Sequence, residues 1–298
     1  GMSDRGVVYD LGYVPYEGER RARRGAISTT YRDGLKRVFG IRRRARKKIL
    51  PWSLVVLAIL PAVVFVGFAF LLSTFSPDAE SPFGSHADYF SLSGGIVLLF
   101  VALAAPELLI PDRREGVLSI YSSRPLRPDD YVGARAASLL TVVAAFMLIP
   151  QTLMYIGFAA LSPDGFFQAL ISNADEIPKI LATTVVYALA YAPLALLIST
   201  FAARKAAATG VFFGVIIVGA GLAATLVSAT SLPGSRYAAL LAFDGHPDFV
   251  RDWIYGRGPD GDIAMSNAGF DPWLSLTVII GVAALSTALV IWRYRRLM

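Results

Sequence analysis

The chain has 298 residues, of which 55% are hydrophobic and only 17% are charged, and its mean hydropathy is +0.56. Such a composition excludes a soluble domain of this length and is typical of an integral membrane protein. The formal net charge is +6 and the sequence contains no cysteine, which excludes structural disulfides and cysteine-ligated metals.

The N-terminal segment, residues 1–50, is strongly basic. It holds fourteen of the 28 Lys and Arg residues but only five of the 22 acidic residues. We expect a cytoplasmic segment with a basic amphipathic helix over 28–50, capped by Ser28 or Thr29, in the membrane interface. Nucleic acid is the disfavoured alternative partner, because anionic lipid already lies beside these cations. The expected interface residues are Arg42, Arg43, Arg44, Lys47, Lys48 and Trp52.

The tyrosines within residues 7–25 leave two interpretations open. They could pack against a partner domain, or they could belong to a flexible tail. The sequence alone does not decide between them.

Six stretches in residues 51–298 are apolar enough, and at about 20 residues or more long enough, to cross a bilayer. They are 52–75, 89–110, 132–161, 178–200, 206–230 and 273–292. We therefore predict an all-α, six-span membrane domain. Pro61, Pro150 and Pro193 are expected to kink their spans.

The charges between the spans predict the orientation, because Lys and Arg concentrate on the cytoplasmic side. Basic residues precede the first span and recur in the loop 111–131, in the turn with Arg204 and Lys205, and in the C-terminal tail. The intervening loops are acidic or mixed. Both termini are therefore expected in the cytoplasm.

The loop 111–131 is too elaborate for a simple connection. We expect Asp112 to cap a short helix that carries Val117, Leu118 and Tyr121 on one side. Pro125 and Pro128 would end that helix. Asp129 or Asp130 would then cap the third span.

The order of residues in this loop resembles that of ABC-2 type permeases, the membrane subunits of one group of ATP-binding-cassette (ABC) transporters. The matching residues are Asp112, Arg113, Glu115, Gly116, Val117, Leu118, Ser123, Arg124, Pro125, Tyr131, Gly133 and Arg135. The resemblance implies a coupling helix that contacts a separate ATPase subunit. A helix resting on lipid headgroups is the alternative. The implied ATPase contacts are Asp112, Arg113, Arg114, Glu115, Gly116, Val117, Leu118, Tyr121, Arg124 and Pro125.

The outer loop 231–272 contains two segments, 237–243 and 249–255, that could form short helices at the membrane interface. Its aspartates and His246 suggest a metal site, but no calcium-loop spacing is present, so a solvated acidic loop is favoured. In the family that the chain resembles, short helices at this position cover the outer end of the pathway.

Two features of the spans suggest helix contacts: an acidic residue and a pair of glycines. Glu107 lies near the inner end of the second span, where pairing with Arg113 or another loop arginine is favoured over a role in proton transfer. Gly210 and Gly214 form a Gly-x-x-x-Gly pattern that predicts a helix-packing surface, either within the chain or across a dimer.

The sequence contains no phosphate-binding Gly-rich motif, no zinc-protease motif and no nucleophile elbow. An enzyme is therefore not expected, and the chain itself would bind neither cofactor nor metal. The resemblance implies that ATP and Mg²⁺ are bound by the partner ATPase. It also implies a second permease subunit, identical or homologous, in a bacterial cytoplasmic membrane, and transport that is usually export. An ion-coupled secondary transporter and a non-transporting scaffold are the alternatives.

Overall fold

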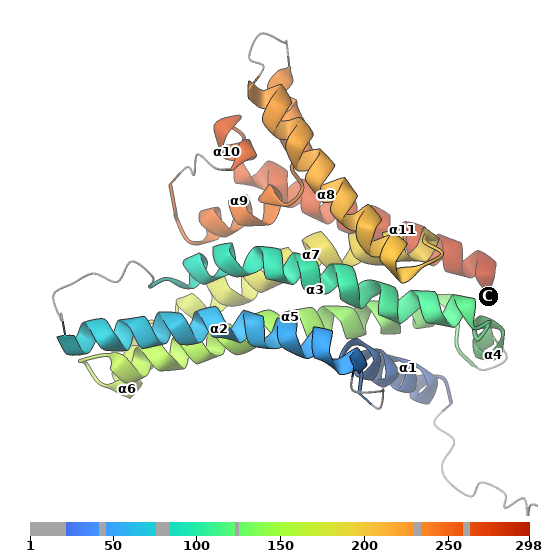
Figure 1. Ribbon diagram of the computed structural model, residues 1–298, viewed down its shortest axis with the longest axis horizontal. Helices are drawn as coiled ribbons and strands as arrows, with labels where there is room; N and C mark the ends of the chain where they lie inside the picture. Colours follow the sequence, from blue (N-terminus) through green and yellow to red (C-terminus); the bar gives the residue numbers. More distant parts are fainter. Residues whose placement is uncertain (1–21, 42–45, 76–83, 123–124, 229–233, 259–262) are drawn as a thin grey trace, which may run out of the picture.

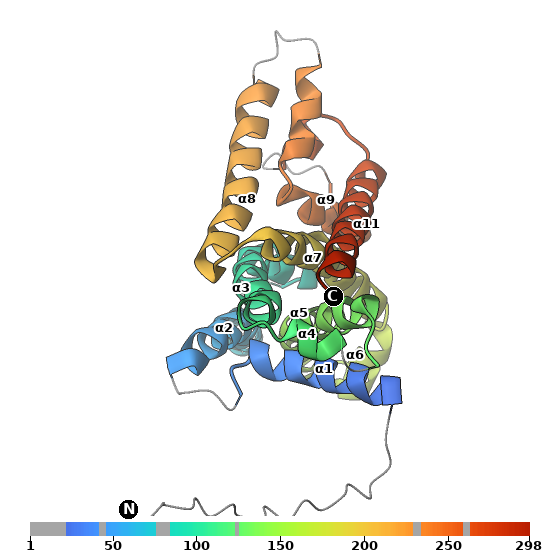
Figure 2. The same cartoon turned by 90° about the vertical axis from the view of Figure 1, so that its right-hand side faces the viewer.

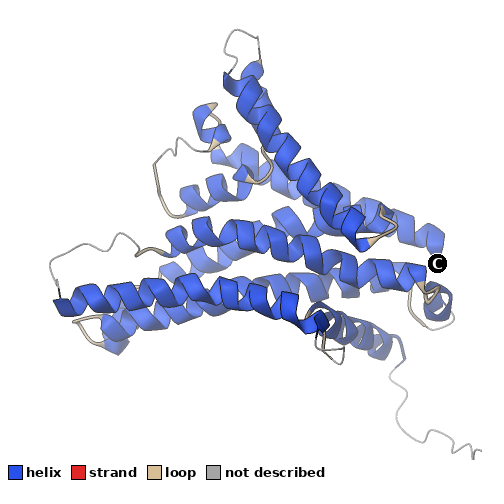
Figure 3. Cartoon of the chain, in the orientation of Figure 1, coloured by secondary structure: helices blue, strands red, loops and turns tan. Residues whose placement is uncertain are grey.

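The computed structural model describes residues 22–41, 46–75, 84–122, 125–228, 234–258 and 263–298. Every regular element in these ranges is a helix (Figures 1 and 3), and six helices of the described chain are long and apolar enough to cross a membrane. This confirms the expected all-α class with six candidate spans and indicates a multi-pass membrane protein. The spans are Pro51–Phe75 of α2 (Arg46–Phe75), α3 (His86–Arg114), α5 (Pro128–Leu161), α7 (Glu176–Phe201), α8 (Lys205–Ser228) and α11 (Pro272–Leu297).

The helices α2, α3, α5 and α7 run side by side, whereas α8 inclines away from them (Figure 1). The short helix α4 (Leu118–Ser122) and the C-terminus lie at one end of the bundle, which we call the α4 end. The helix α6 (Phe166–Ser172) lies at the opposite end, which we call the α6 end. The helix α6 was not predicted.

The starts of α3 and α5 follow local hydrogen bonds. Ser85 caps α3 by accepting a hydrogen bond from the Asp88 amide, while the Asp88 carboxylate accepts one from the Ser85 amide. α5 begins with Pro128 in its first turn, where a missing amide donor costs nothing. Asp130 lies within that turn and accepts from the amide of Arg127, so the prediction that Asp129 or Asp130 is the capping residue was wrong.

The N-terminal helix α1 (Ala22–Val38) is shorter and begins earlier than predicted. It ends before Gly40, whose φ of +63° is a left-handed conformation that glycine adopts without strain. In Figure 2, which looks at the α4 end, α1 crosses the bundle on its outside. Its buried residues Thr30, Gly34 and Val38 recur every fourth position and face α5, so this face is covered by protein.

Most of the predicted interface residues lie outside what the structure describes. Arg42, Arg43 and Arg44 fall outside the described residues, and the side chains of Lys47 and Lys48, in the first turn of α2, are not described either. Trp52 is half exposed, and its ring lies 6.0 Å from that of Phe39. The lipid contact of this basic run therefore stays a prediction.

Three short helices follow α8: the 3₁₀-helix η1 (Ser235–Leu241), α9 (Gly245–Ile254) and α10 (Ala264–Asn267). The two short helices expected in the loop 231–272 are thus present, as η1 and α9. However, α9 packs against α7 and α11 and lies between α8 and α11 (Figure 2). It is part of the bundle, whereas the sequence suggested an interfacial helix.

The close approach of α1 to α5 can be tested at Gly34. A Cβ at Gly34 would lie 2.2 Å from the Oγ and 2.7 Å from the Cβ of Ser138. We expect Gly34→Ala to destabilise the protein by about 1–3 kcal/mol through overpacking, measured as a lower unfolding temperature in detergent. Adding Ser138→Gly should recover part of the loss, and Gly133→Ala, at an open helical position of α5, is the control. Equal unfolding temperatures for the two alanine variants would contradict this packing.

Candidate functional site

The loop that resembles a coupling helix begins inside α3. That helix continues through Pro111 to Arg114, and Glu115 ends it by donating its amide to the carbonyl of Pro111. Gly116 then adopts a φ of +68° before α4 begins. The prediction that Asp112 caps the short helix was therefore wrong, because Asp112 lies in the last turn of α3.

Asp112 is completely buried and lies between cations from two other helices. Its carboxylate accepts from Arg37 of α1 at 2.7 Å, from Arg135 of α5 at 2.8 Å and from the Tyr131 hydroxyl at 2.7 Å. Asp33 of α1 binds the same two arginines, at 2.7 Å and 2.9 Å. These five residues, which we call the Asp112 cluster, connect α1, α3 and α5.

The charges of the Asp112 cluster balance, with two carboxylates against two guanidinium groups. Balance matters because an unpaired buried charge costs several kcal/mol. In the sequence, Arg135 belongs to the residue pattern that resembles ABC-2 permeases. An arginine inside an apolar span nevertheless requires an anionic partner, so its position was a signal that Asp112 would turn inward.

Aromatic rings extend the Asp112 cluster to two further helices. The ring of Tyr131 lies 5.6 Å from that of Tyr121 in α4 and 5.3 Å from that of Tyr294 in α11. Burial raises the pKa of Tyr121, and the nearby Asp112 carboxylate acts in the same direction. The hydroxyl of Tyr121 is therefore neutral at physiological pH.

Arg113 binds the end of a different helix. Its guanidinium donates to the backbone carbonyls of Ser199, Thr200 and Ala202, where α7 ends. The last carbonyls of a helix lack intrahelical partners and carry partial negative charge, so a cation satisfies them. Asp112 and Arg113 thus connect the last turn of α3 to α1, α5 and α7.

The exposed part of the predicted ATPase-contact surface is therefore smaller than the set of residues predicted from the sequence. Arg114, Glu115, Gly116 and Pro125 are exposed, whereas Val117 and Tyr121 are half-buried and Leu118 is buried. Arg124 lies outside the described residues. Because Asp112 is buried and Arg113 binds the end of α7, the accessible surface of this loop in the described chain begins at Arg114.

Glu107 forms an ion pair with Lys205 at the start of α8, with the two atoms 2.6 Å apart. An acidic residue inside a span is thus matched by a cation, as the sequence suggested, and the described partner is a lysine, whereas Arg113 binds the end of α7. The pair connects α3 to α8 near the α4 end.

Gly210 and Gly214 have no neighbour within 4 Å of where a Cβ would stand, among the residues that the structure describes. The helix-packing surface predicted there is therefore not used within the described chain. Packing against another chain stays a prediction.

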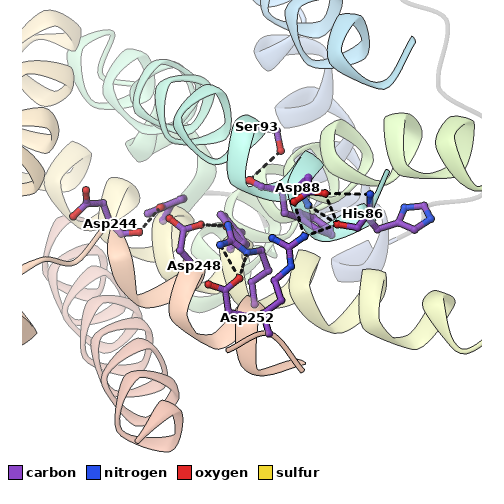
Figure 4. Close-up of polar contacts among 12 residues, drawn as sticks. His86, Asp88, Ser93, Asp244, Asp248 and Asp252 are labelled. Atoms are coloured by element: carbon purple, nitrogen blue, oxygen red, sulfur yellow. Dashed lines mark hydrogen bonds and ion pairs between the residues drawn. The ribbon is translucent and has the colours of Figure 1, made fainter. Parts of the chain in front are cut away.

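A second buried ionic group lies on α9, where the sequence suggested a solvated loop. Arg251 donates to Asp248 at 2.6 Å and to Asp252 at 2.8 Å, and the hydroxyl of Tyr187 also donates to Asp248 (Figure 4). Arg251 is only 2% exposed. Tyr187 lies near the middle of the apolar helix α7, so these four residues, the α9 cluster, join α9 to the bundle there, with Arg251 and Asp252 buried and the Asp248 side chain 32% exposed.

Burial raises the pKa of the Asp248 carboxyl, although Arg251 opposes the shift. Sequence reasoning missed the α9 cluster because aspartates in a Gly-rich loop resemble a solvated surface. The available signal was helical spacing, since Asp248, Arg251 and Asp252 are separated by three and four positions.

The α6 end also contains a cavity of about 440 Å³ between α3, α5, α6, α7 and the end of α9. Its aromatic wall includes His86, whose Nδ1 lies 2.5 Å from Oε1 of Gln151. Its polar wall includes Arg257, which binds Ser85 and Asp88 of α3 (Figure 4). The described part of the chain shows no group of three or more His, Asp or Glu side chains placed to hold a metal.

The Asp112 cluster predicts unequal effects for two aspartates at the same end. Asp112→Ala would leave Arg135 buried with one fewer anionic partner, and we expect a destabilisation of about 3–5 kcal/mol. Asp129→Asn removes only an exposed pair with Arg295 and should leave the unfolding temperature unchanged. Urea or thermal unfolding in detergent checks both, and similar losses for the two variants would contradict the structural role of Asp112.

His246 predicts a pH dependence of stability. Burial lowers the pKa of His246, so its ring is neutral at physiological pH. Nε2 donates to the carbonyl of Leu240, and the unprotonated Nδ1 then accepts from the hydroxyl of Ser275. The unfolded chain binds the proton more readily, so stability is present above about pH 6.5 and falls as the pH drops below it. The unfolding temperature should decrease between pH 7.5 and 5.5 more in the wild type than in His246→Gln. Equal slopes would contradict the prediction.

Comparisons with known proteins leave this site to be interpreted from its own geometry. No protein-family model matches the chain, and no curated protein matches it either. Its function is therefore inferred from the residues and contacts described above.

Proposed function

We propose that the chain is the transmembrane permease subunit of an ABC transporter of the ABC-2 type. In this proposal a separate subunit binds ATP and Mg²⁺ and hydrolyses ATP, and the chain carries a substrate out of the cytoplasm. The supporting sequence feature is the residue order of the loop 111–131. The observation that carries the proposal is that this loop leaves α3 in a turn whose two charged side chains bind three other helices.

The contacts suggest how motion of an ATPase would reach the spans. A force on α4 and on the end of α3 acts on Asp112 and Arg113, and through them on α1, α5 and α7. Because an unpaired buried charge is costly, these helices move together and do not separate. ATP binding would bias the assembly between two arrangements that differ in the spacing of the coupling loops.

The distribution of charge supports a cytoplasmic location for the α4 end. Its exposed cations include Arg114 and Arg127 in the loop and Arg295 and Arg296 near the C-terminus. Such an excess of basic residues is typical of the cytoplasmic side. Both termini would then be cytoplasmic, and the cavity at the α6 end would face outward.

A second permease subunit, identical or homologous, completes the proposed assembly. The exposed surface of α8, with Gly210 and Gly214, is available for contact with it or with lipid. The apolar lining of the spans favours a hydrophobic or amphipathic substrate.

An ion-coupled secondary transporter is the second candidate, and the α9 cluster favours it. Buried ionisable groups at the middle of a membrane bundle are typical of ion-coupled transport. No such group is evident near the middle of the spans in the sequence, but Asp248 and Arg251 of α9 bind Tyr187 near the middle of α7. Transport in sealed vesicles separates the candidates, because the permease requires ATP and its ATPase, whereas the secondary transporter requires an ion gradient that ionophores abolish.

The proposal predicts that the exposed turn after α3 controls coupling to the ATPase. Gly116 has a φ of +68°, so Gly116→Ala strains or moves this turn at a cost of about 1–2 kcal/mol. We expect the variant to fold but to lose most of the ATPase activity that depends on the permease. The measurement is ATP hydrolysis by a P-loop ATPase co-expressed and purified with the chain.

Gly269→Ala is the matched control, since Gly269 also has a φ of +68° in open space but precedes α11, at the end of that helix opposite the C-terminus and the α4 end. It should share the loss of stability and keep the coupling. Exchanging the charges of Arg114 and Glu115, which are exposed, should weaken co-purification of the ATPase. If the ATPase stays bound and equally active in all of these variants, the assignment of the loop is wrong.

A further inference from the structure

A polar groove of about 520 Å³ lies at the α4 end between α1 and the last turn of α3. One wall is a single face of α1, on which Arg32, Asp33, Lys36 and Arg37 project at helical spacing. The other wall contains Pro111 of α3 and Glu115, which follows it. The groove therefore lies directly beside the turn that the proposed function assigns to the ATPase.

The cations of the groove fall into two kinds. Arg37 is neutralised within the Asp112 cluster, since it binds both Asp33 and Asp112. Asp33 in turn binds Arg37 and Arg135, and its ion pairs in the described chain include neither Arg32 nor Lys36. Arg32 and Lys36 are exposed, and among the residues that the structure describes neither has an ionic partner.

Two unpaired cations one helical turn apart repel each other, so an anion that bridges them is favoured. The lining of the groove is mostly polar, with Ile41 and Pro111 as its apolar members. A site for a lipid headgroup would be expected to continue into an apolar channel for the acyl chains, which this lining does not provide. A protein segment fits the groove better than a lipid.

We infer that this groove receives an acidic segment of the ATPase subunit, whose carboxylates bridge Arg32 and Lys36. The inference rests on the proposed function and adds a second contact to that of α4. Glu115 on the opposite wall repels carboxylates, so the acidic segment lies along α1. Because α1 joins α5 and α3 through the Asp112 cluster, this contact reaches the same helices as α4 does.

The test uses the full chain in nanodiscs of neutral phosphatidylcholine and the purified ATPase subunit, with affinity measured at low and high ionic strength. Arg32→Glu and Lys36→Glu should each weaken binding about tenfold at low salt. The salt dependence seen for the wild type should largely disappear, since screening acts on this attraction. Arg24→Glu is the matched control, because Arg24 is also an exposed cation of α1 but does not line the groove.

Reversal of an acidic ATPase residue to lysine should restore binding to Lys36→Glu and so identify the segment. Wild-type affinity in both groove variants, with the Arg114 and Glu115 exchange still disruptive, would overturn the groove inference and leave the proposed function intact. An effect that appears only in nanodiscs with anionic lipid would also overturn it, since the occupant would then be a headgroup. If the ATPase did not bind even the wild-type chain, the proposed function would be overturned as well.

Discussion

The carboxylate of Asp112 has no access to solvent, and the arrangement of the α4 end follows from that constraint. A buried anion requires cations at hydrogen-bonding distance, and α3 supplies none on the same side, so Arg37 comes from α1 and Arg135 from α5. The two arginines in turn require Asp33, which orients α1 across the bundle. One buried charge thus specifies how three helices meet, in a region where apolar packing alone would allow sliding.

The two ends of the bundle are both held by polar contacts, but in different ways. At the α4 end the contacts join the ends of long helices, including α7 through Arg113. Towards the α6 end they join the segment around α9 to the bundle, since Asp248 of α9 binds Tyr187 near the middle of α7, and Arg257, which follows α9, binds Asp88 in the first turn of α3. A displacement at the α4 end would therefore move whole spans.

Hydropathy was sufficient to place the six apolar helices, because an apolar run of about 20 residues satisfies its backbone hydrogen bonds in a membrane by forming a helix. It did not place the end of α3, since Pro111 followed by four charged residues resembles a loop. The helix continues because Asp112 and Arg113 find their partners on other helices, which a local reading of the sequence cannot show. α9 was misjudged for a related reason, because its charges are satisfied by one another and by the distant Tyr187. In both cases a contact with another helix turns inward a charged segment that resembles a surface loop.

The ion pairs and hydrogen bonds at the end of α3 also divide residues 112–116 into two groups, one that binds other helices and one that is exposed. Asp112 and Arg113 face the protein interior and bind other helices. Arg114, Glu115 and Gly116 are exposed, and among the described residues the side chains of Arg114 and Glu115 form no ion pair. Adjacent residues on a helix turn point in different directions, so one turn can receive a contact and transmit it. A connection that only joined two spans would need neither the buried charge of Asp112 nor the contacts of the half-buried Arg113 with α7. The burial therefore supports a loop on which force is exerted from outside the membrane domain.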